Sequence, residues 1–246
     1  SYQKSTLQCA RGTPRGTPRG GGPLSLPAPM LTPCTLPAPK NATTLDASQW
    51  TNADWKFDKK GVMPRGKGNN LTKQSYGDAR IHLEFRFEPS DNPEWKGQLY
   101  GNSGIFLMSG YELQVVNSFQ NPTFADGTCG SIYGQHPPRV NASRKPGEWQ
   151  AYDILMKAPV FSKKGTVEQP MRTTVFHNGI LIHDDAWIYG AVGGPYKKHG
   201  KRPLMIQDHK GTGVSFRNLW IIPDLKYEQS LDSFRNLYPK PDKSSI

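Results

Sequence analysis

The chain has 246 residues, of which 35% are hydrophobic, 25 are Gly and 22 are Pro. This turn-rich composition argues against long helical bundles, and no apolar run is long enough to cross a bilayer. The net charge is +11, but residues 1–40 contribute five basic and no acidic side chains, so the rest of the chain is only mildly basic. Its basic residues are scattered, and we therefore expect no nucleic-acid partner and no membrane span.

Residues 1–44 differ in composition from the rest of the chain. The sequence Arg-Gly-Thr-Pro occurs twice in succession at residues 11–18, and Leu-Pro-Ala-Pro follows at 26–29 and 36–39. Prolines lack the backbone N–H and glycines lose much entropy on ordering, so this block predicts an extended arm or linker. The arm is either a passive tether or a segment that docks on a protein partner or on a second copy of the chain.

The three cysteines, Cys9, Cys34 and Cys129, are too few and too widely spaced for a zinc cage. Pairing of Cys9 with Cys34 would leave Cys129 free, but the other pairings, or none, are equally compatible with the sequence. The chain shows no charged-then-apolar export signal at its first residues.

From about residue 45 the pattern changes to short strands. Residues 79–87 alternate apolar and polar side chains, which predicts a strand buried on one face. Residues 103–108 and 111–116 flank a Ser-Gly turn and predict a hairpin. Further strands are predicted at 149–156, 171–177, 180–183, 203–207 and 214–222.

Many short strands without a helical pattern predict an all-β fold of two packed antiparallel sheets, a jelly-roll sandwich. We expect this domain to span residues 45–225. Residues 226–246 are then a tail with a short helix, because Leu231, Phe234, Leu237 and Tyr238 have helical spacing.

Two predicted strands carry unusual polar faces. The first presents His82, Glu84 and Arg86, and the second presents Glu112 and Gln114. Solvated sheet faces carry mostly Thr, Ser and Lys, so we expect these residues to line a ligand groove. Glu84 and Glu112 are expected on neighbouring strands, where like-charge coupling could raise the pKa of one carboxyl toward neutrality.

Seven motifs in chain order resemble the 3-keto-disaccharide hydrolase family, long known only as a domain of unknown function. They are LTKQSYGDARIHLEFR (71–86), GNSGIF (101–106), YELQ (111–114), GSIYG (130–134), PGEW (146–149), NG (178–179) and PLMIQDH (203–209) with VSFRN (214–218). The resemblance covers roughly residues 45–225. It implies a concanavalin-like jelly roll that is usually exported, hence a secreted, periplasmic or cell-surface location.

The family resemblance also implies an enzyme that cleaves oxidised mono- or disaccharide glycosides carrying a ketone at carbon 3. That ketone acidifies the hydrogen on carbon 2, so such a site needs a base, an enolate stabiliser and an acid for the leaving oxygen. Glu112 and His209 are the candidates for base and acid. The candidate substrate-binding residues are Glu84, Arg86, Asn102, Gln114, Gln207, Asp208 and Arg217, although Asn102 and Asp208 could instead only hold loops.

A divalent cation would polarise the ketone, and His82, Glu84, Glu112 and His209 are suitable ligand types. Their spacing forms no compact ligand motif, so the cofactor stays open. Retaining glycosidases on this fold carry Glu-x-Asp-x-x-Glu along a strand, which is absent here. The alternative to an enzyme is a non-catalytic carbohydrate-binding or surface-assembly module on the same fold. The insertion at residues 158–170 departs from the family and could shape the groove rim or contact another protein.

Overall fold

The computed structural model describes residues 36–210 and 213–227. The strands are β1 (Thr43–Thr44), β2 (Met63–Pro64), β3 (Asn70–Tyr76), β4 (Ala79–Phe87), β5 (Asn102–Leu107), β6 (Tyr111–Val116), β7 (Gln150–Lys157), β8 (Val160–Phe161), β9 (Val167–Gln169), β10 (Met171–His177), β11 (Ile180–Ile188), β12 (Arg202–Ile206) and β13 (Val214–Pro223). Three short 3₁₀ turns are η1 (Ala47–Gln49), η2 (Gly97–Leu99) and η3 (Ala125–Gly127).

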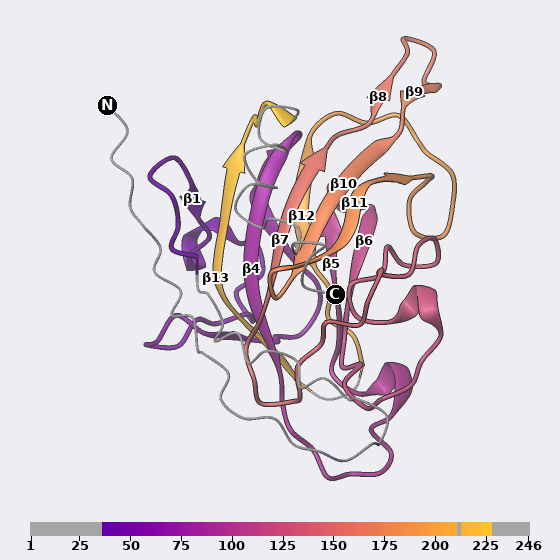
Figure 1. Cartoon of the computed structure of the whole chain (residues 1–246). Coiled ribbons are helices and arrows are strands. Elements are labelled where there is room, and N and C mark those ends of the chain that lie inside the picture. The colour runs from indigo at the N-terminus through magenta and orange to yellow at the C-terminus, as the bar shows by residue number, and fades with distance from the viewer. Residues whose placement is uncertain (1–35, 211–212, 228–246) are drawn as a thin grey trace, which may run out of the picture. The chain divides into compact units, whose positions relative to one another are not determined.

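The strands form two antiparallel sheets that pack face to face (Figure 1). The larger sheet has the order β1-β13-β4-β7-β10-β11, with β2 also paired to β13, and the smaller sheet has the order β3-β12-β5-β6. A separate hairpin pairs β8 with β9. The predicted all-β, two-sheet sandwich is confirmed.

The core lies between the two sheets and follows from the alternation along each strand. In β4 the side chains of Ile81, Leu83 and Phe85 point inward and are fully buried. Phe85 lies 4.7 Å from the Tyr152 ring of β7. Burial of each such side chain contributes about 1.5–3 kcal/mol, so the strands are held rigidly where their outer faces carry polar groups.

The outer face of β4 differs from the sequence-based expectation. His82 and Glu84 are only 0% and 1% exposed, so β4 is buried on both faces. Trp220 of β13 stacks on the His82 ring at 5.0 Å, and the Leu36 carbonyl accepts hydrogen bonds from the side chains of Asn218 and Trp220. Side chains of β13 and the segment at Leu36 therefore pack near the outer face of β4, which the pattern predicted to be open.

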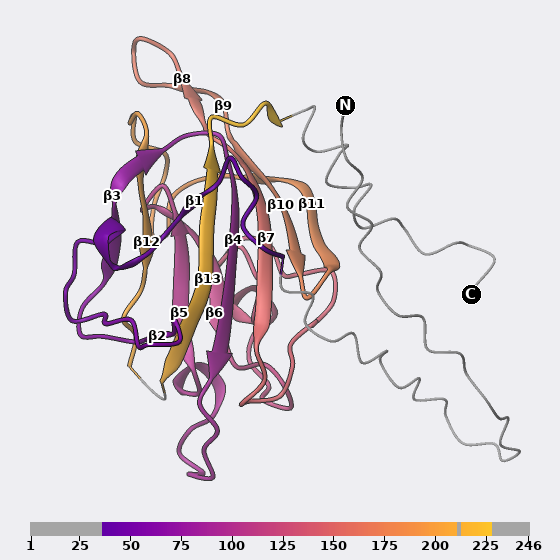
Figure 2. The ribbon, with the colours of Figure 1, turned by 90° about the vertical axis from the view of Figure 1, so that its left-hand side faces the viewer.

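The sheet begins earlier in the chain than expected. Thr43 and Thr44 of β1 pair with Ile221 and Trp220 (Figure 2), so the part of the predicted arm from Leu36 to Thr44 belongs to the sandwich. Five strands were not predicted from the sequence because they are short or polar and show no clear alternation: β1, β2, β3, β8 and β9. The expected C-terminal helix, Cys9, Cys34 and the arm before residue 36 lie outside the described residues. Cys129, which is described, is buried and has a free thiol. No helix in the described ranges has the length and apolar character needed to traverse a bilayer.

Candidate functional site

A polar pocket of about 160 Å³ opens on the outer face of the four-stranded sheet. Alternate residues of a strand point to the same face, so β5 contributes Asn102 and Phe106, and β6 contributes Glu112 and Gln114. The pocket is completed by Gln207 and His209 beyond β12, Gln98 in η2, and Tyr133 and Val192 in loops.

Glu112 is the titratable group with the most unusual environment in this pocket. Its side chain is 6% exposed and makes no hydrogen bond or ion pair with another described residue. Burial raises its pKa from the ordinary value of 4.5 to about 7. A carboxyl with this pKa is available both as a base and as an acid near neutral pH, which suits a proton-transfer role.

Gly104 makes the space that Glu112 occupies. It lies on β5 opposite Gln114, and a Cβ at this position would stand 2.3 Å from the Oε1 atom of Glu112 and 2.9 Å from the Phe106 ring. Any side chain at residue 104 would therefore displace the carboxylate. The glycine belongs to the GNSGIF motif, but its role could not be predicted without the register of the hairpin.

Two amide oxygens in the pocket have no hydrogen-bond partner among the described residues. They are Oδ1 of Asn102 and Oε1 of Gln207, and both are buried. A buried polar atom without a partner costs about 1–3 kcal/mol. Hydroxyl groups are donors of the kind that pair with such acceptors.

Gln98 orients the amides at one side of the pocket. Its backbone carbonyl and its Oε1 atom accept hydrogen bonds from Nδ2 of Asn102 at 2.8 and 3.0 Å, and Oε1 also accepts one from Gln114 at 3.1 Å. Its own Nε2 donates to Thr123 and to the Gly127 carbonyl. Gln98 was not identified from the sequence, because it lies in the three-residue 3₁₀ turn η2, which is too short to show a pattern.

His209 lines the pocket. Its Nδ1–H donates to the Lys210 carbonyl at 2.8 Å, which leaves Nε2 available for a ligand. The adjacent Asp208 does not line the pocket. It pairs with Arg65 at 3.4 Å and accepts a hydrogen bond from the Gly68 backbone at 2.8 Å, so it holds the loop instead.

Three expected substrate contacts lie on the other sheet. Glu84 accepts hydrogen bonds from Arg217 at 2.6 Å and Asn218 at 2.9 Å on the outer face of the seven-stranded sheet, while Arg86 pairs with Glu88 at 3.3 Å. The expectation that Glu84, Arg86 and Arg217 share a groove with Glu112 is therefore wrong.

The predicted coupling between Glu84 and Glu112 is also wrong, because β4 and β6 belong to different sheets. Burial alone would raise the pKa of Glu84. Hydrogen bonds from His82, Asn218 and Arg217 outweigh that effect and lower it. The raised pKa of Glu112 arises from burial and not from a second carboxylate.

The four candidate metal ligands do not come together. His82 binds Asp153 through Nδ1 at 3.0 Å and lies with Glu84 on the seven-stranded sheet, whereas Glu112 and His209 line the pocket of the other sheet. Within residues 36–210 and 213–227, no group of three or more His, Cys, Asp or Glu side chains is arranged to hold a metal ion. Burial alone would lower the pKa of His82, but the hydrogen bonds and charges of Asp153 and Glu84 raise it.

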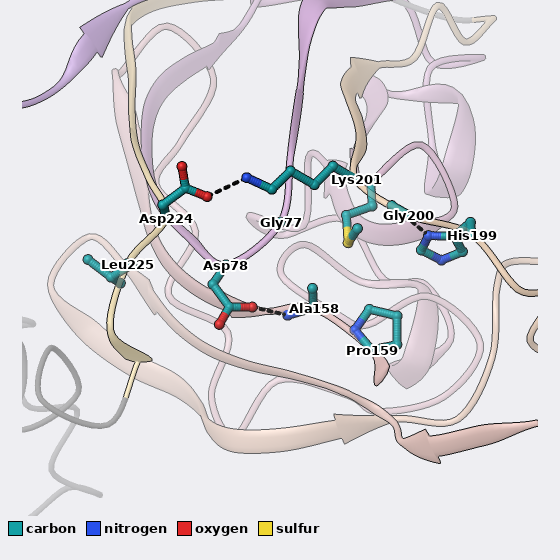
Figure 3. Close-up of a pocket in the computed structure, with 10 residues that line it drawn as sticks. Gly77, Asp78, Ala158, Pro159, His199, Gly200, Lys201, Asp224 and Leu225 are labelled. Carbon is teal, nitrogen blue, oxygen red and sulfur yellow. Dashed lines mark hydrogen bonds and ion pairs between the residues drawn. The ribbon is translucent and has the colours of Figure 1, made fainter. Parts of the chain in front are cut away.

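A larger hollow of about 450 Å³ shares no lining residue with the polar pocket (Figure 3). Its charged groups are already engaged, since Lys201 forms an ion pair with Asp224 and Asp78 accepts a hydrogen bond from the Ala158 backbone at 2.8 Å. We therefore place the candidate site at the smaller pocket. Five of the nine residues predicted from the sequence meet there: Asn102, Glu112, Gln114, Gln207 and His209.

The family model for the 3-keto-alpha-glucoside-1,2-lyase-like domain matches residues 40–222, which contain every residue of the polar pocket. The chain belongs to this family. The resemblance inferred from the seven motifs is confirmed, and family membership places the chain among carbohydrate-active proteins.

Two solved structures support this membership. A protein from Parabacteroides distasonis ATCC 8503, solved at 2.13 Å and described provisionally as a glycosyl hydrolase, is 38% identical, has a TM-score of 0.70, and aligns over 75% of this chain and 84% of its own. A second protein from the same organism, with the same provisional description, is 18% identical with a TM-score of 0.51 over 74% of this chain and 90% of its own, and supports the fold alone. A comparison with curated proteins found no match.

Proposed function

We propose that the protein cleaves glycosides whose sugar carries a ketone at carbon 3, by elimination followed by hydration. The observation that carries the proposal is the buried carboxyl of Glu112, whose pKa is about 7, in a pocket with unpartnered amide acceptors. Family membership suggests the class of substrate. Ordinary glycosidases need a pair of carboxylates, whereas the described pocket contains one, Glu112, which suits transfer of a single proton.

The reaction begins with removal of the proton on carbon 2. The Glu112 carboxylate accepts this proton, and the electrons of the C2–H bond form an enolate whose charge rests on the oxygen at carbon 3. The enolate re-forms the ketone, a double bond forms between carbons 1 and 2, and the bond from carbon 1 to the leaving oxygen breaks. The leaving oxygen takes a proton from an acid.

Hydration completes the cycle. Water adds its oxygen to carbon 1, and a proton returns to carbon 2, so the net reaction is hydrolysis. Microscopic reversibility lets the protonated Glu112 return the proton that it removed. His209 lines the pocket and has no described partner at Nε2, so we assign it as the acid for the leaving oxygen and the base that activates the water.

The amides position the sugar for these steps. Oδ1 of Asn102 and Oε1 of Gln207 accept hydrogen bonds from sugar hydroxyls and so hold carbon 2 toward Glu112. The orientation of the Asn102 amide is set before the ligand arrives, because its Nδ2 atom donates hydrogen bonds to the backbone carbonyl and Oε1 of Gln98. Preorganised contacts of this kind lower the entropy loss of reaching the transition state.

The test is incubation with a 3-keto glucoside in deuterated water, with NMR observation of carbon 2 and of the released aglycone. We expect the unchanged protein and an exposed control, Glu94→Gln, to incorporate deuterium at carbon 2 and release the aglycone, and Glu112→Gln to do neither. Aglycone release without deuterium would contradict the elimination route. Binding without either event would indicate a carbohydrate-binding module, and parallel reactions with a chelator test whether a divalent cation takes part, which the sequence leaves open.

A further inference from the structure

The insertion at residues 158–170 forms the β8–β9 hairpin, which projects beyond the neighbouring strands (Figure 1). Its turn is closed by a hydrogen bond from the Gly165 N–H to the Ser162 carbonyl at 3.1 Å, and Gly165 has a φ of +91° that favours glycine. Lys163 and Lys164 occupy the two central positions of this turn. The hairpin therefore presents two ammonium groups at a defined tip.

The hairpin packs against the loop that precedes β12. The Phe161 ring lies 5.9 Å from the Tyr196 ring and 5.2 Å from the His199 ring, and the Nζ atom of Lys198 donates to the Lys163 carbonyl at 2.9 Å. These aromatic rings and this hydrogen bond hold the two segments side by side. Lysines that are distant in the sequence are thereby collected on one surface.

We define the basic platform as the six exposed cationic residues of segments 158–170 and 195–202. Glu168 is the only acidic residue in these two segments, and Lys201 is paired with Asp224 outside them. Among the described residues, no carboxylate forms an ion pair with Lys163, Lys164 or the other platform cations except Lys201. The platform consists of Lys163, Lys164, Lys197, Lys198, Lys201 and Arg202.

The hollow shown in Figure 3 lies at the base of this platform. His199 and Lys201 line it from the loop, and Ala158 lines it from the start of the insertion, but Asp78 and Asp224 line it as well. These carboxylates disfavour an anion inside the hollow. An anionic partner would instead lie across the exposed lysine tips.

We propose that the basic platform binds an acidic polysaccharide. Lysine is a compact point charge on a flexible stem, which suits sulfate or carboxylate groups spaced along a polymer. Phe161 and Tyr196 face one another inside the packed segments, so they are not displayed for stacking on bases. Val160, 41% exposed, is the one strongly exposed apolar residue of the two segments, which is too little to insert into a lipid surface.

The platform is continuous in sequence with the polar pocket. The chain that ends β11 contributes Val192 to the pocket and then supplies Lys197 and Lys198 to the platform within the same loop. A polymer held on the platform would therefore raise the concentration of glycosidic ends near Glu112. The proposal uses the carbohydrate-active family membership of the chain and does not depend on the elimination mechanism.

The test measures binding of the full chain to dextran sulfate, with unmodified dextran as the neutral probe, over a series of salt concentrations. The variant carries Lys163→Gln, Lys164→Gln, Lys197→Gln and Lys198→Gln. A control with the same change in charge carries Lys56→Gln, Lys59→Gln, Lys60→Gln and Lys73→Gln, all exposed elsewhere on the surface. We expect the platform variant to bind dextran sulfate at least about tenfold more weakly, and its affinity to depend less on salt.

Separate outcomes would overturn the proposal. Equal losses in the two variants would mean that only net charge matters, and retention of binding by the platform variant would place the contact elsewhere, for example in residues 1–35. Equal or tighter binding of the unchanged protein to a short DNA duplex or to phosphatidylserine vesicles would overturn the assignment to polysaccharide. Because binding is measured directly, failure of the catalytic proposal would leave this result interpretable.

Discussion

Replacement of Glu112 by Gln should stabilise the folded protein at alkaline pH while abolishing its activity. The pKa of Glu112 rises from 4.5 to about 7 because the ionised carboxylate is buried without a partner. At about 1.36 kcal/mol per pKa unit, ionising Glu112 in the folded state costs about 3 kcal/mol more than in the unfolded chain. Glutamine has nearly the same shape and does not ionise, so it avoids this cost.

The pH at which the difference appears follows from the sign of the shift. A carboxyl with a raised folded-state pKa binds its proton more tightly in the folded protein. Its contribution to stability is complete below the unfolded value of 4.5 and is lost as the pH rises through about 7. We therefore expect the two proteins to have similar stability below pH ~4.5 and Glu112→Gln to be more stable by up to about 3 kcal/mol above pH ~8.

The assay is urea unfolding at a series of pH values. For a typical slope of about 2–3 kcal/mol/M, the midpoint of Glu112→Gln should exceed that of the unchanged protein by about 1 M at alkaline pH. The exposed variant Glu94→Gln should follow the unchanged protein throughout. Parallel pH curves for Glu112→Gln and the unchanged protein would refute the argument, since they would show that Glu112 titrates normally.

The remaining predictions concern residues around the pocket and on the opposite sheet. Gly104→Ala should displace the Glu112 carboxylate and lower kcat by about 100-fold, while the control Glu94→Gln should keep the kcat of the unchanged protein. Unchanged turnover by Gly104→Ala would contradict the steric argument. Gln207→Ala should raise KM for the 3-keto glucoside about tenfold without destabilising the free protein, because the Oε1 atom that it removes has no hydrogen-bond partner among the described residues. A fall in kcat with an unchanged KM would exclude a role of Gln207 in binding. Asp153→Asn should lower the free energy of unfolding by about 3 kcal/mol, most strongly below pH 6.5. Asp153 is hydrogen-bonded to the buried imidazole of His82, whose raised pKa makes the contribution of this pair present below pH 6.5 and lost as the pH rises through the folded-state pKa. The variant should keep the kcat of the unchanged protein, and a loss of activity in the folded variant would link the two sheets.

Much of the sandwich could be predicted from alternation, because side chains with a period of two identify a strand and the two faces that it presents. The strands at Ala79–Phe87, Tyr111–Val116 and Met171–His177 have the predicted ends. Strand β11 runs on to Ile188 because a bulge near Val175 lets pairing with β10 continue beyond the expected end. Short or polar strands such as β1 and β3 are held in place by pairing with β13 and β12. Their own sequences alternate too little for a strand to be recognised.

Sheet membership could not be predicted, and this explains the errors at the candidate site. Alternation shows that Glu84 and Glu112 each lie on a polar face, but it does not show which sheet contains each strand. That information resides in long-range pairing, which joins β4 to β13 and β7, and β6 to β5. The motifs contain both the pocket residues around Glu112 and the buried hydrogen-bonded residues around Glu84 on the opposite sheet. The resemblance alone did not separate these two groups.

The close approach of Gly104 to Glu112 links two positions that are eight residues apart across a hairpin. The two positions constrain each other in size: a larger residue at 104 requires a shorter one at 112, and a shorter residue at 112 leaves a void above the glycine. Comparison of homologous sequences should therefore show joint substitution at these two positions. A homologue that keeps the glycine but replaces the acid would be a natural candidate for a member that binds sugars without cleaving them.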